Sequence, residues 1–387
     1  MVMYTLPIEA FNSIETPFYY YDMDLLRDTL NTYNSHLNKH NYVAHYAVKA
    51  NAEKRIMDEI RKAGFGVDCV SGNEVKLAIK YGFSPDKIVY AGVGKSDKEI
   101  KAALKAGIYA FNCESVEEIK VIGELAKSMG KVAHISIRVN PDIDAHTHKY
   151  ISTGKKEDKF GISPWMFEDV LNTIQTSDHL ELIGLHFHIG SQITELGVFK
   201  TLCQRIEDLQ KWFLDRGVLV ESLDLGGGLG VDYVDPVGNP IAKFDEYFDI
   251  ISKNLIVRPG QSVHFEPGRA IVAQCGTLIS RVLYVKKGKG IKFAILDAGM
   301  NDLIRPALYH AHHKIDNLTS TGRRLKYDVV GPVCESSDFW DKKIVLPETK
   351  RGDLIAIRSA GAYGQVMGMR YNQRDLAKAY YSDDLKK

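Results

Sequence analysis

The residue with the clearest chemical potential is Lys49, which follows the β-rich run 42–48. A lysine at the carboxyl end of a buried strand is partly desolvated, which favours its neutral, nucleophilic amine. Such an amine can form a Schiff base with a carbonyl compound, for example the aldehyde of pyridoxal phosphate. The alternative is a lysine whose side chain simply extends into solvent.

A glycine triplet, Gly226-Gly227-Gly228, follows a later apolar run at 222–225. Glycines at a strand end let backbone N–H groups approach and surround a phosphate. The alternative is a flexible turn. In a parallel barrel the loops after the seventh and eighth strands commonly bind phosphate, which favours the first interpretation.

The motif Glu266-Pro267-Gly268-Arg269 follows the next expected strand. A carboxylate there could pair with a protonated ring nitrogen, and the arginine could hold a phosphate or a carboxylate. The alternative is an ordinary surface pair of opposite charges, which contributes little.

Two groups of histidines invite a metal hypothesis. His186 and His188 lie two residues apart on one expected strand, so both face the same side. We see no companion Asp/His set at the other strand ends, and therefore expect no metal site. His186 then reads as a core histidine satisfied by hydrogen bonds. His310, His312 and His313 are expected to form a polar surface turn.

The later part of the chain offers a thiol, a cation and two phenols. Cys334 stands among Gly, Pro and polar residues, so it is a candidate acid or nucleophile if the fold brings it to the site. A lone cysteine is otherwise most often a small buried hydrophobe. For the cation and the two phenols, the alternative is a structural role, in which Arg305 forms a salt bridge and the aromatic rings of Tyr309 and Tyr363 lie in an interface.

The elements that must position these residues follow a repeated pattern of short apolar strand, polar turn, amphipathic helix and glycine stop. This pattern predicts a (β/α)8 barrel with its active site at the carboxyl ends of the strands. The strands are expected at residues 42–48, 66–70, 87–91, 109–112, 132–139, 182–188, 222–225 and 263–265.

The pattern breaks twice. Residues 141–159 are polar and aperiodic, which indicates a long functional loop or lid. From about residue 270 the chain alternates apolar and polar residues, with runs at 277–285, 291–296, 327–330 and 353–358. We therefore expect a barrel domain at 20–268, and a β-rich domain made of 1–19 and 269–387.

Composition narrows the class of protein. The chain has 387 residues, a formal net charge of +1 and 45% hydrophobic residues, so nothing indicates binding to nucleic acid or to an anionic membrane. No apolar run reaches transmembrane length, and the first eleven residues do not resemble a signal peptide. Five scattered cysteines fit a reducing cytoplasm better than a disulfide framework.

Together these motifs resemble the fold-type III pyridoxal-phosphate decarboxylases, and within them the diaminopimelate decarboxylases. The matching segments follow the family's order along nearly the whole chain, which is far more specific than any single motif. They are residues 46–51, 138–141, 150–154, 159–161, 188–192, 226–230, 266–269, 305–309, 334–338 and 361–364. The chain departs from the family pattern at 365–375, where we expect atypical local packing.

The resemblance implies a role for each candidate residue. Lys49 would carry the cofactor covalently, His188 would stack on its ring, and Glu266 would keep the ring nitrogen protonated. Cys334 would be the proton donor. The other implied cofactor contacts are Ser191, Gly226, Gly227, Gly228, Pro267, Gly268, Arg269 and Tyr363. The implied substrate contacts are Arg269, Arg305, Tyr309, Glu335 and Tyr363.

The resemblance also implies an activity, which is decarboxylation of meso-2,6-diaminopimelate to L-lysine and CO2. It further implies a homodimer, in which Cys334 and Glu335 are delivered to the partner's barrel. The main alternative is a sister decarboxylase of ornithine, arginine or carboxynorspermidine. A non-catalytic regulatory homologue is less favoured, because Lys49, Glu266 and Cys334 are all present. The cysteine motif argues against a related racemase.

Overall fold

The computed structural model describes residues 4–143 and 159–385, which form two compact units. The barrel unit comprises Leu30–Gly230 and Lys243–Gly268. The β-rich unit comprises the described residues of Met1–Thr29, Val231–Ala242 and Arg269–Lys387. The short segment Val231–Ala242 therefore interrupts the barrel unit in sequence but belongs to the β-rich unit.

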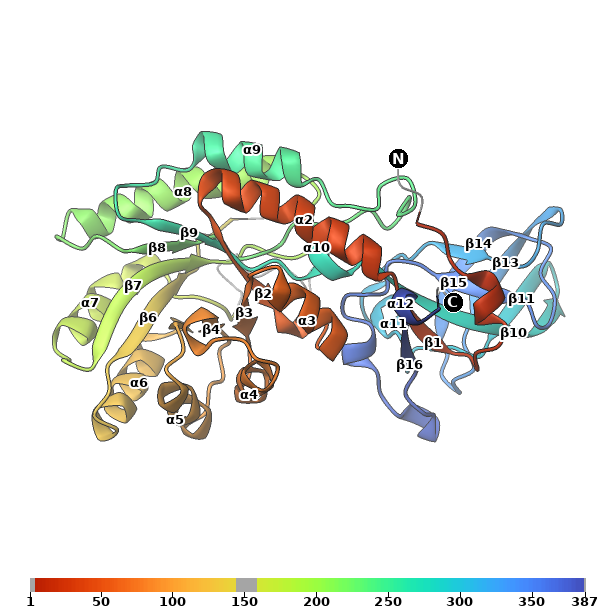
Figure 1. The fold of residues 1–387 in the computed structure, drawn as a ribbon, viewed down its shortest axis with the longest axis horizontal. Helices are drawn as coiled ribbons and strands as arrows, with labels where there is room; N and C mark the ends of the chain where they lie inside the picture. Colours follow the sequence, from red (N-terminus) through yellow and green to blue (C-terminus); the bar gives the residue numbers. More distant parts are fainter. Residues whose placement is uncertain (1–3, 144–158, 386–387) are drawn as a thin grey trace. The chain divides into compact units, whose positions relative to one another are not determined.

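The barrel unit contains a closed barrel of eight parallel strands in chain order (Figure 1), which confirms the predicted fold class. Because parallel barrel strands are buried on both faces, they read as short apolar runs in the sequence. The strands are β2 Val43–Ala47, β3 Gly66–Cys69, β4 Ile88–Tyr90, β5 Ala110–Cys113, β6 Ala133–Val139, β7 Leu180–Phe187, β8 Ser222–Asp224 and β9 Ser262–Phe265.

Helices follow most of these strands, and their first turns explain where they begin. Ser71 and Ser115 accept hydrogen bonds from the backbone N–H groups of Glu74 and Glu118, which caps two of the helices. The helices are α2 Met23–His40, α3 Lys54–Lys62, α4 Gly72–Lys80, α5 Asp97–Ala106, α6 Val116–Ser128, α7 Phe167–Gln175, α8 Gly197–Leu214 and α9 Phe244–Asn254. Within the described part of the chain, no helix combines the length and apolarity needed to cross a membrane.

In its described residues, the β-rich unit contains an eight-stranded mixed sheet, the first turns of α2 and four short α-helices. Its central path runs β12-β15-β10-β11-β13-β14, and β1 pairs with both β10 and β16. The strands are β1 Phe18–Tyr21, β10 Gly276–Gly288, β11 Ile291–Leu296, β12 Ile315–Asn317, β13 Arg324–Val330, β14 Phe339–Pro347, β15 Leu354–Ile357 and β16 Lys378–Tyr381. The helices are α1 Ile8–Phe11, α10 Arg269–Val272, α11 Arg305–Tyr309 and α12 Ser382–Leu385.

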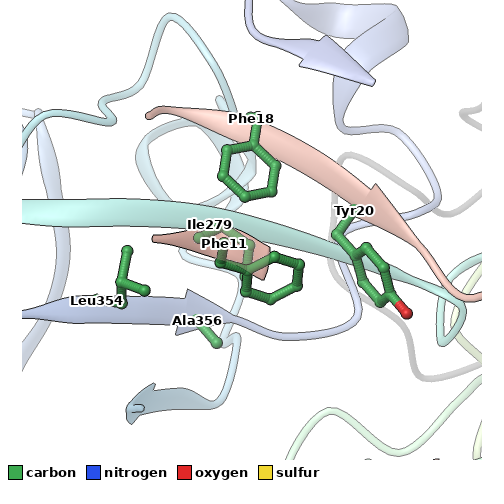
Figure 2. Close-up of a cluster of buried hydrophobic side chains, with 6 residues drawn as sticks. All are labelled: Phe11, Phe18, Tyr20, Ile279, Leu354 and Ala356. Carbon is green, nitrogen blue, oxygen red and sulfur yellow. The ribbon is translucent and has the colours of Figure 1, made fainter. Parts of the chain in front are cut away.

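An aromatic cluster explains why the N-terminal residues join this unit. Phe11 of α1 packs edge-on against Phe18 and Tyr20 of β1, with ring centroids 5.3 and 5.1 Å apart. Figure 2 shows these rings against Ile279 and Leu354, from the strands β10 and β15. Burying several large apolar side chains stabilises the attachment by roughly 1.5–3 kcal/mol for each side chain.

Candidate active site

Lys49 lies at the carboxyl end of β2, in the single 3-10 turn Val48–Ala50. Its Nζ lies 3.1 Å from Oδ2 of Asp68 on the neighbouring strand β3, and the Lys49 side chain is 37% exposed while Asp68 is fully buried. Burial and the negative charge of Glu266 raise the pKa of the Asp68 carboxyl above its usual value, while Lys49 opposes this shift. The amine therefore sits at the barrel mouth against an acidic partner that the sequence analysis missed.

Glu266 follows β9 directly and is only 5% exposed. Nδ2 of Asn112 donates to Oε1 of Glu266 at 3.0 Å, and Nε2 of His186 donates to its Oε2 at 2.9 Å. Burial raises the pKa of the Glu266 carboxyl, but the charge and hydrogen bond of His186 and the charge of Lys49 outweigh it and hold that pKa well below its usual value. Glu266 is thus a buried, ionised carboxylate, as partnership with a protonated ring nitrogen requires.

Asp224 ends β8, and one of its carboxyl oxygens lies within 4.8 Å of the ligand atoms of Glu266 and His186. Its Oδ1 accepts a hydrogen bond from the N–H of Gly226 at 2.8 Å. Burial and the negative charge of Glu266 raise the pKa of Asp224 well above its usual value, so this acid stays neutral. Of these two neighbouring carboxyl groups, Glu266 therefore favours the ionised form and Asp224 the protonated form.

Replacing Asp224 by asparagine is expected to stabilise the protein at pH 8. Above its ordinary pKa of about 3.9, Asp224 ionises in the unfolded chain but keeps its proton in the folded one, so stability falls as pH rises. Asparagine removes this penalty and still accepts from Gly226, so the free energy of unfolding should rise by on the order of 1 kcal/mol. Denaturant unfolding at pH 8 and pH 5 should show a smaller gain at pH 5. An equal loss of stability at both pH values would show that Asp224 is ionised.

The expectation that His186 has no acidic companions at the other strand ends was wrong. His186 does have acidic companions, since ligand atoms of His186, Asp224 and Glu266 all lie within 4.8 Å of one another. These atoms are already engaged in hydrogen bonds. Glu266 accepts from His186 and from Asn112, and Asp224 accepts from the N–H of Gly226. The hydrogen bonding makes the cluster a polarised carboxylate site, which suits a cationic ring nitrogen.

His188 follows β7 and lies half-buried at the same end of the barrel. The N–H of Gly227 donates to Nδ1 of His188 at 3.3 Å, which makes Nδ1 an acceptor. Burial and the positive charges of Arg138 and Lys49 hold the pKa of His188 well below its usual value. The imidazole is therefore neutral, carries its proton on Nε2, and can lie against an aromatic ring.

The glycine triplet is required by close backbone packing. A Cβ at Gly226 would collide with the carbonyl oxygen of Phe187, and one at Gly227 with that of Glu266. Gly228 has φ +111°, and a Cβ there would lie 2.7 Å from the carbonyl oxygen of Gly190. The loop is therefore a tightly fitted element, and its binding of a phosphate stays a prediction.

The remaining barrel candidates lie close to these elements in sequence or space. The carbonyl oxygen of Pro267 accepts from the N–H of Ala47 at 3.0 Å, and a Cβ at Gly268 would meet the methyl groups of Ala47 and Ala50 at 3.1 Å. The Glu266 motif is thereby packed against the turn that carries Lys49. Ser191 is part-buried in the loop after β7.

A buried ion pair fixes the start and end of the predicted lid. Nη1 of Arg138 donates to Oε1 of Glu114 at 2.6 Å, and Oε2 of Glu114 accepts from the N–H of Gly161 at 2.7 Å. The guanidinium of Arg138 also lies 4.6 Å from the ring centroid of Phe160. Two motifs that are distant in sequence therefore meet at Glu114, whereas residues 144–158 of the predicted lid lie outside the described residues.

The β-rich unit brings together the two predicted arginines. Arg269 and Arg305 begin α10 and α11, both are buried, and both donate to the hydroxyl of Tyr233. The guanidinium of Arg269 also lies 4.9 Å from the ring centroid of Tyr363. Tyr309 ends α11 and is half-buried. Tyr233 was not predicted, because its isolated position in a loop carries no recognisable pattern.

The expectation of a polar surface turn is wrong for His313. This histidine is only 3% exposed, and its Nε2 lies 2.8 Å from Nη1 of Arg305. His310 and His312 are more accessible, and Nδ1 of His312 lies 3.3 Å from Oδ2 of Asp341. Neighbouring histidines thus have different environments, which the sequence pattern could not separate.

Cys334 and Glu335 are exposed on one loop of the β-rich unit. Asp338 holds this loop, because its side chain accepts from the N–H groups of Val333 and Met300 at 2.6 and 2.7 Å. The thiol is therefore accessible and does not belong to the hydrophobic core, which removes the alternative of a buried structural cysteine.

The atypical segment 365–375 packs onto the Cys334 loop. The N–H of Cys334 donates to Oδ1 of Asn372 at 3.0 Å, and the hydroxyl of Tyr371 donates to Oε2 of Glu335 at 3.1 Å. Despite its departure from the family pattern, this segment therefore holds both the candidate acid and its neighbour.

Comparisons with known proteins agree with this geometry. The family model "Pyridoxal-dependent decarboxylase, pyridoxal binding domain" matches residues 23–273. A curated diaminopimelate decarboxylase from Bacteroides thetaiotaomicron is 53% identical over 380 residues, covering 98% of each chain.

Two solved structures have the same architecture. The crystal structure of diaminopimelate decarboxylase from Helicobacter pylori complexed with L-lysine has a TM-score of 0.90 and 42% identity, covering 96% of this chain and 93% of that one. The enzyme from M. jannaschii, also with L-lysine, has a TM-score of 0.89 and 31% identity, covering 97% and 89%. The chain therefore belongs to the pyridoxal-dependent decarboxylases and, within them, to the diaminopimelate decarboxylase family.

Proposed function

We propose that this chain is a carboxy-lyase that converts meso-2,6-diaminopimelate to L-lysine and CO2 with pyridoxal phosphate as cofactor. The main support for the proposal is that the Lys49 amine and the ionised, buried Glu266 both lie at the carboxyl ends of the strands of one closed barrel. The relatives at 53% and 43% identity, which cover nearly the whole chain, support the choice of substrate.

The residues at this mouth fit the cofactor. Lys49 offers an amine for an aldehyde, and Glu266 offers a negative charge for a protonated ring nitrogen. The glycine triplet has no room for side chains and so can present its backbone directly to a phosphate. Neutral His188 provides a flat imidazole beside these groups.

The cofactor, when bound, accepts the electron pair that departing CO2 leaves behind. This chain supplies the other parts of the reaction. Lys49 would hold the cofactor, Glu266 would keep the proton on its ring nitrogen, and His188 would fix the ring. Cys334 would donate a proton to the carbon that has lost CO2.

We also propose that the chain works as a homodimer with shared active sites. Lys49 belongs to the barrel unit, whereas Cys334 lies exposed on the β-rich unit, together with Glu335. An isologous pair of subunits would exchange these loops symmetrically. We further propose a cytoplasmic location, in which the five free cysteines stay reduced.

Replacing Arg305 by alanine is expected to lower kcat/KM for diaminopimelate, because the substrate's distal carboxylate would lose a buried, bidentate partner. The decrease should correspond to a loss of about 2–5 kcal/mol in transition-state stabilisation. Steady-state kinetics checks this, with Arg323→Ala as a control that removes an exposed arginine of the same unit. An unchanged kcat/KM in Arg305→Ala would remove Arg305 from the site.

The proposed function is tested by a substrate panel. Protein supplied with pyridoxal phosphate should release CO2 and L-lysine in equal amounts from meso-diaminopimelate, and should act far more slowly on ornithine, arginine and carboxynorspermidine. Preference for one of the other three substrates would identify a sister decarboxylase. No release from any of them would leave the regulatory homologue as the better interpretation.

A further inference from the structure

Two side chains of the β-rich unit that take no part in the proposed reaction accept hydrogen bonds from the guanidinium of Arg305. Its Nη1 donates to the hydroxyl of Tyr233 at 3.0 Å and to Nε2 of His313 at 2.8 Å. Both protons of this nitrogen are thereby used, and the guanidinium also lies 4.9 Å from the ring centroid of Tyr233. These contacts set the plane of the guanidinium.

The hydrogen bonds of His313 determine its protonation state. Its Nδ1 lies 2.8 Å from the backbone carbonyl oxygen of Arg358 and must donate to it, so Nε2 carries no proton and accepts from Arg305. Burial and the charge of Arg305 hold the pKa of His313 well below its usual value. The ring is also packed edge-on against Tyr233, with centroids 5.0 Å apart. His313 is therefore a fixed, neutral acceptor.

The hydrogen bonds of Arg305 leave one edge of its guanidinium for a ligand. Arg269 donates to the same Tyr233 hydroxyl at 2.8 Å, so two buried guanidinium groups converge on one oxygen. Within the described chain, Nη2 and Nε of Arg305 make no hydrogen bond. A carboxylate would bind this edge in the two-point geometry that guanidinium groups prefer.

We propose that His313 and Tyr233 are positioning residues that orient Arg305 toward the substrate's distal carboxylate, and so help select substrates that carry one. The inference rests on the proposed function, because it assigns that carboxylate to Arg305. Neither residue is proposed to touch the reacting atoms. Their loss should therefore affect carboxylate recognition more than chemistry.

Two ligands that differ by this carboxylate provide the test. L-lysine retains the distal carboxylate of diaminopimelate, and cadaverine lacks it. Calorimetric titration of the holoenzyme should show that His313→Leu and Tyr233→Phe each weaken L-lysine binding about 10-fold or more, while cadaverine changes less than about 2-fold. His313→Gln keeps an acceptor for Arg305 and should recover most of the L-lysine affinity. With diaminopimelate, KM should rise more than kcat falls.

His312→Leu is the matched control, because it removes the adjacent, more exposed histidine, and it should change neither affinity. Equal weakening of both ligands, or unchanged L-lysine binding, would overturn the positioning role. If His313→Leu does not fold, Tyr233→Phe decides by the same comparison. If the wild type releases no lysine from diaminopimelate but the variants still lose L-lysine selectively, the proposed function fails and the positioning role stands.

Discussion

Lys49→Ala is expected to lower kcat for diaminopimelate by at least about 1,000-fold. Among the described residues, Lys49 is the only lysine that both pairs with Asp68 and helps to lower the pKa of Glu266, and the variant removes its amine. The variant would lose the proposed covalent hold on the cofactor and the positive charge that helps keep Glu266 ionised. Turnover measured at saturating cofactor checks the prediction.

The fold of this variant should be intact, because the Lys49 side chain is 37% exposed and closes no hydrophobic core. Lys62→Ala provides a control, since Lys62 forms a surface pair with Glu59 on α3 and should keep full activity. A Lys49→Ala protein that retains more than about a tenth of wild-type turnover would show that Lys49 does not carry the chemistry.

Mixing two inactive variants is expected to restore activity to about a quarter of the wild-type value, if active sites are shared in a twofold dimer. Lys49→Ala and Cys334→Ala homodimers should each be nearly inactive, because one would lack the proposed cofactor lysine and the other the proposed proton donor. After random subunit exchange at equal concentrations, about half the dimers are mixed, and one of the two sites in each combines an intact Lys49 with an intact Cys334.

A matched mixture separates sharing from other effects. Lys49→Ala and Glu266→Gln both damage the barrel unit, so their mixed dimers should contain no intact site and should stay inactive. If exchange is verified by differently tagged subunits and the Lys49/Cys334 mixture stays inactive, each Cys334 serves its own barrel.

The barrel could be predicted from the sequence because its signals are local. Buried parallel strands read as short apolar runs, and residues such as Lys49 and Glu266 stand out because they are polar at the ends of those runs. In the β-rich unit, β14 was missed because its middle residues are exposed and polar. Its place in the sheet depends on pairing with β13, which no local pattern reveals.

The partners of the candidate residues could not be predicted, because they depend on which strands and loops meet. In the sequence, Asp68 and Asn112 are ordinary residues of predicted strands. Only the closed barrel brings Asp68 to Lys49 and Asn112 to Glu266. His313 was assigned to the surface because its neighbours are polar. It is buried because Arg305 and the carbonyl group of Arg358 satisfy both of its nitrogens. The sequence therefore indicated the candidate reacting groups but not the residues that hold them.

We expect pyridoxal phosphate to be attached covalently to Lys49 of this barrel, and chemical trapping can identify the attachment site. The holoenzyme is reduced with sodium borohydride, digested, and analysed by peptide mass spectrometry. We predict that the reduced pyridoxyl group is found on the peptide that contains Lys49 and on no other peptide. Attachment to a different lysine, or no attachment in protein shown to contain the cofactor, would show that Lys49 does not carry it.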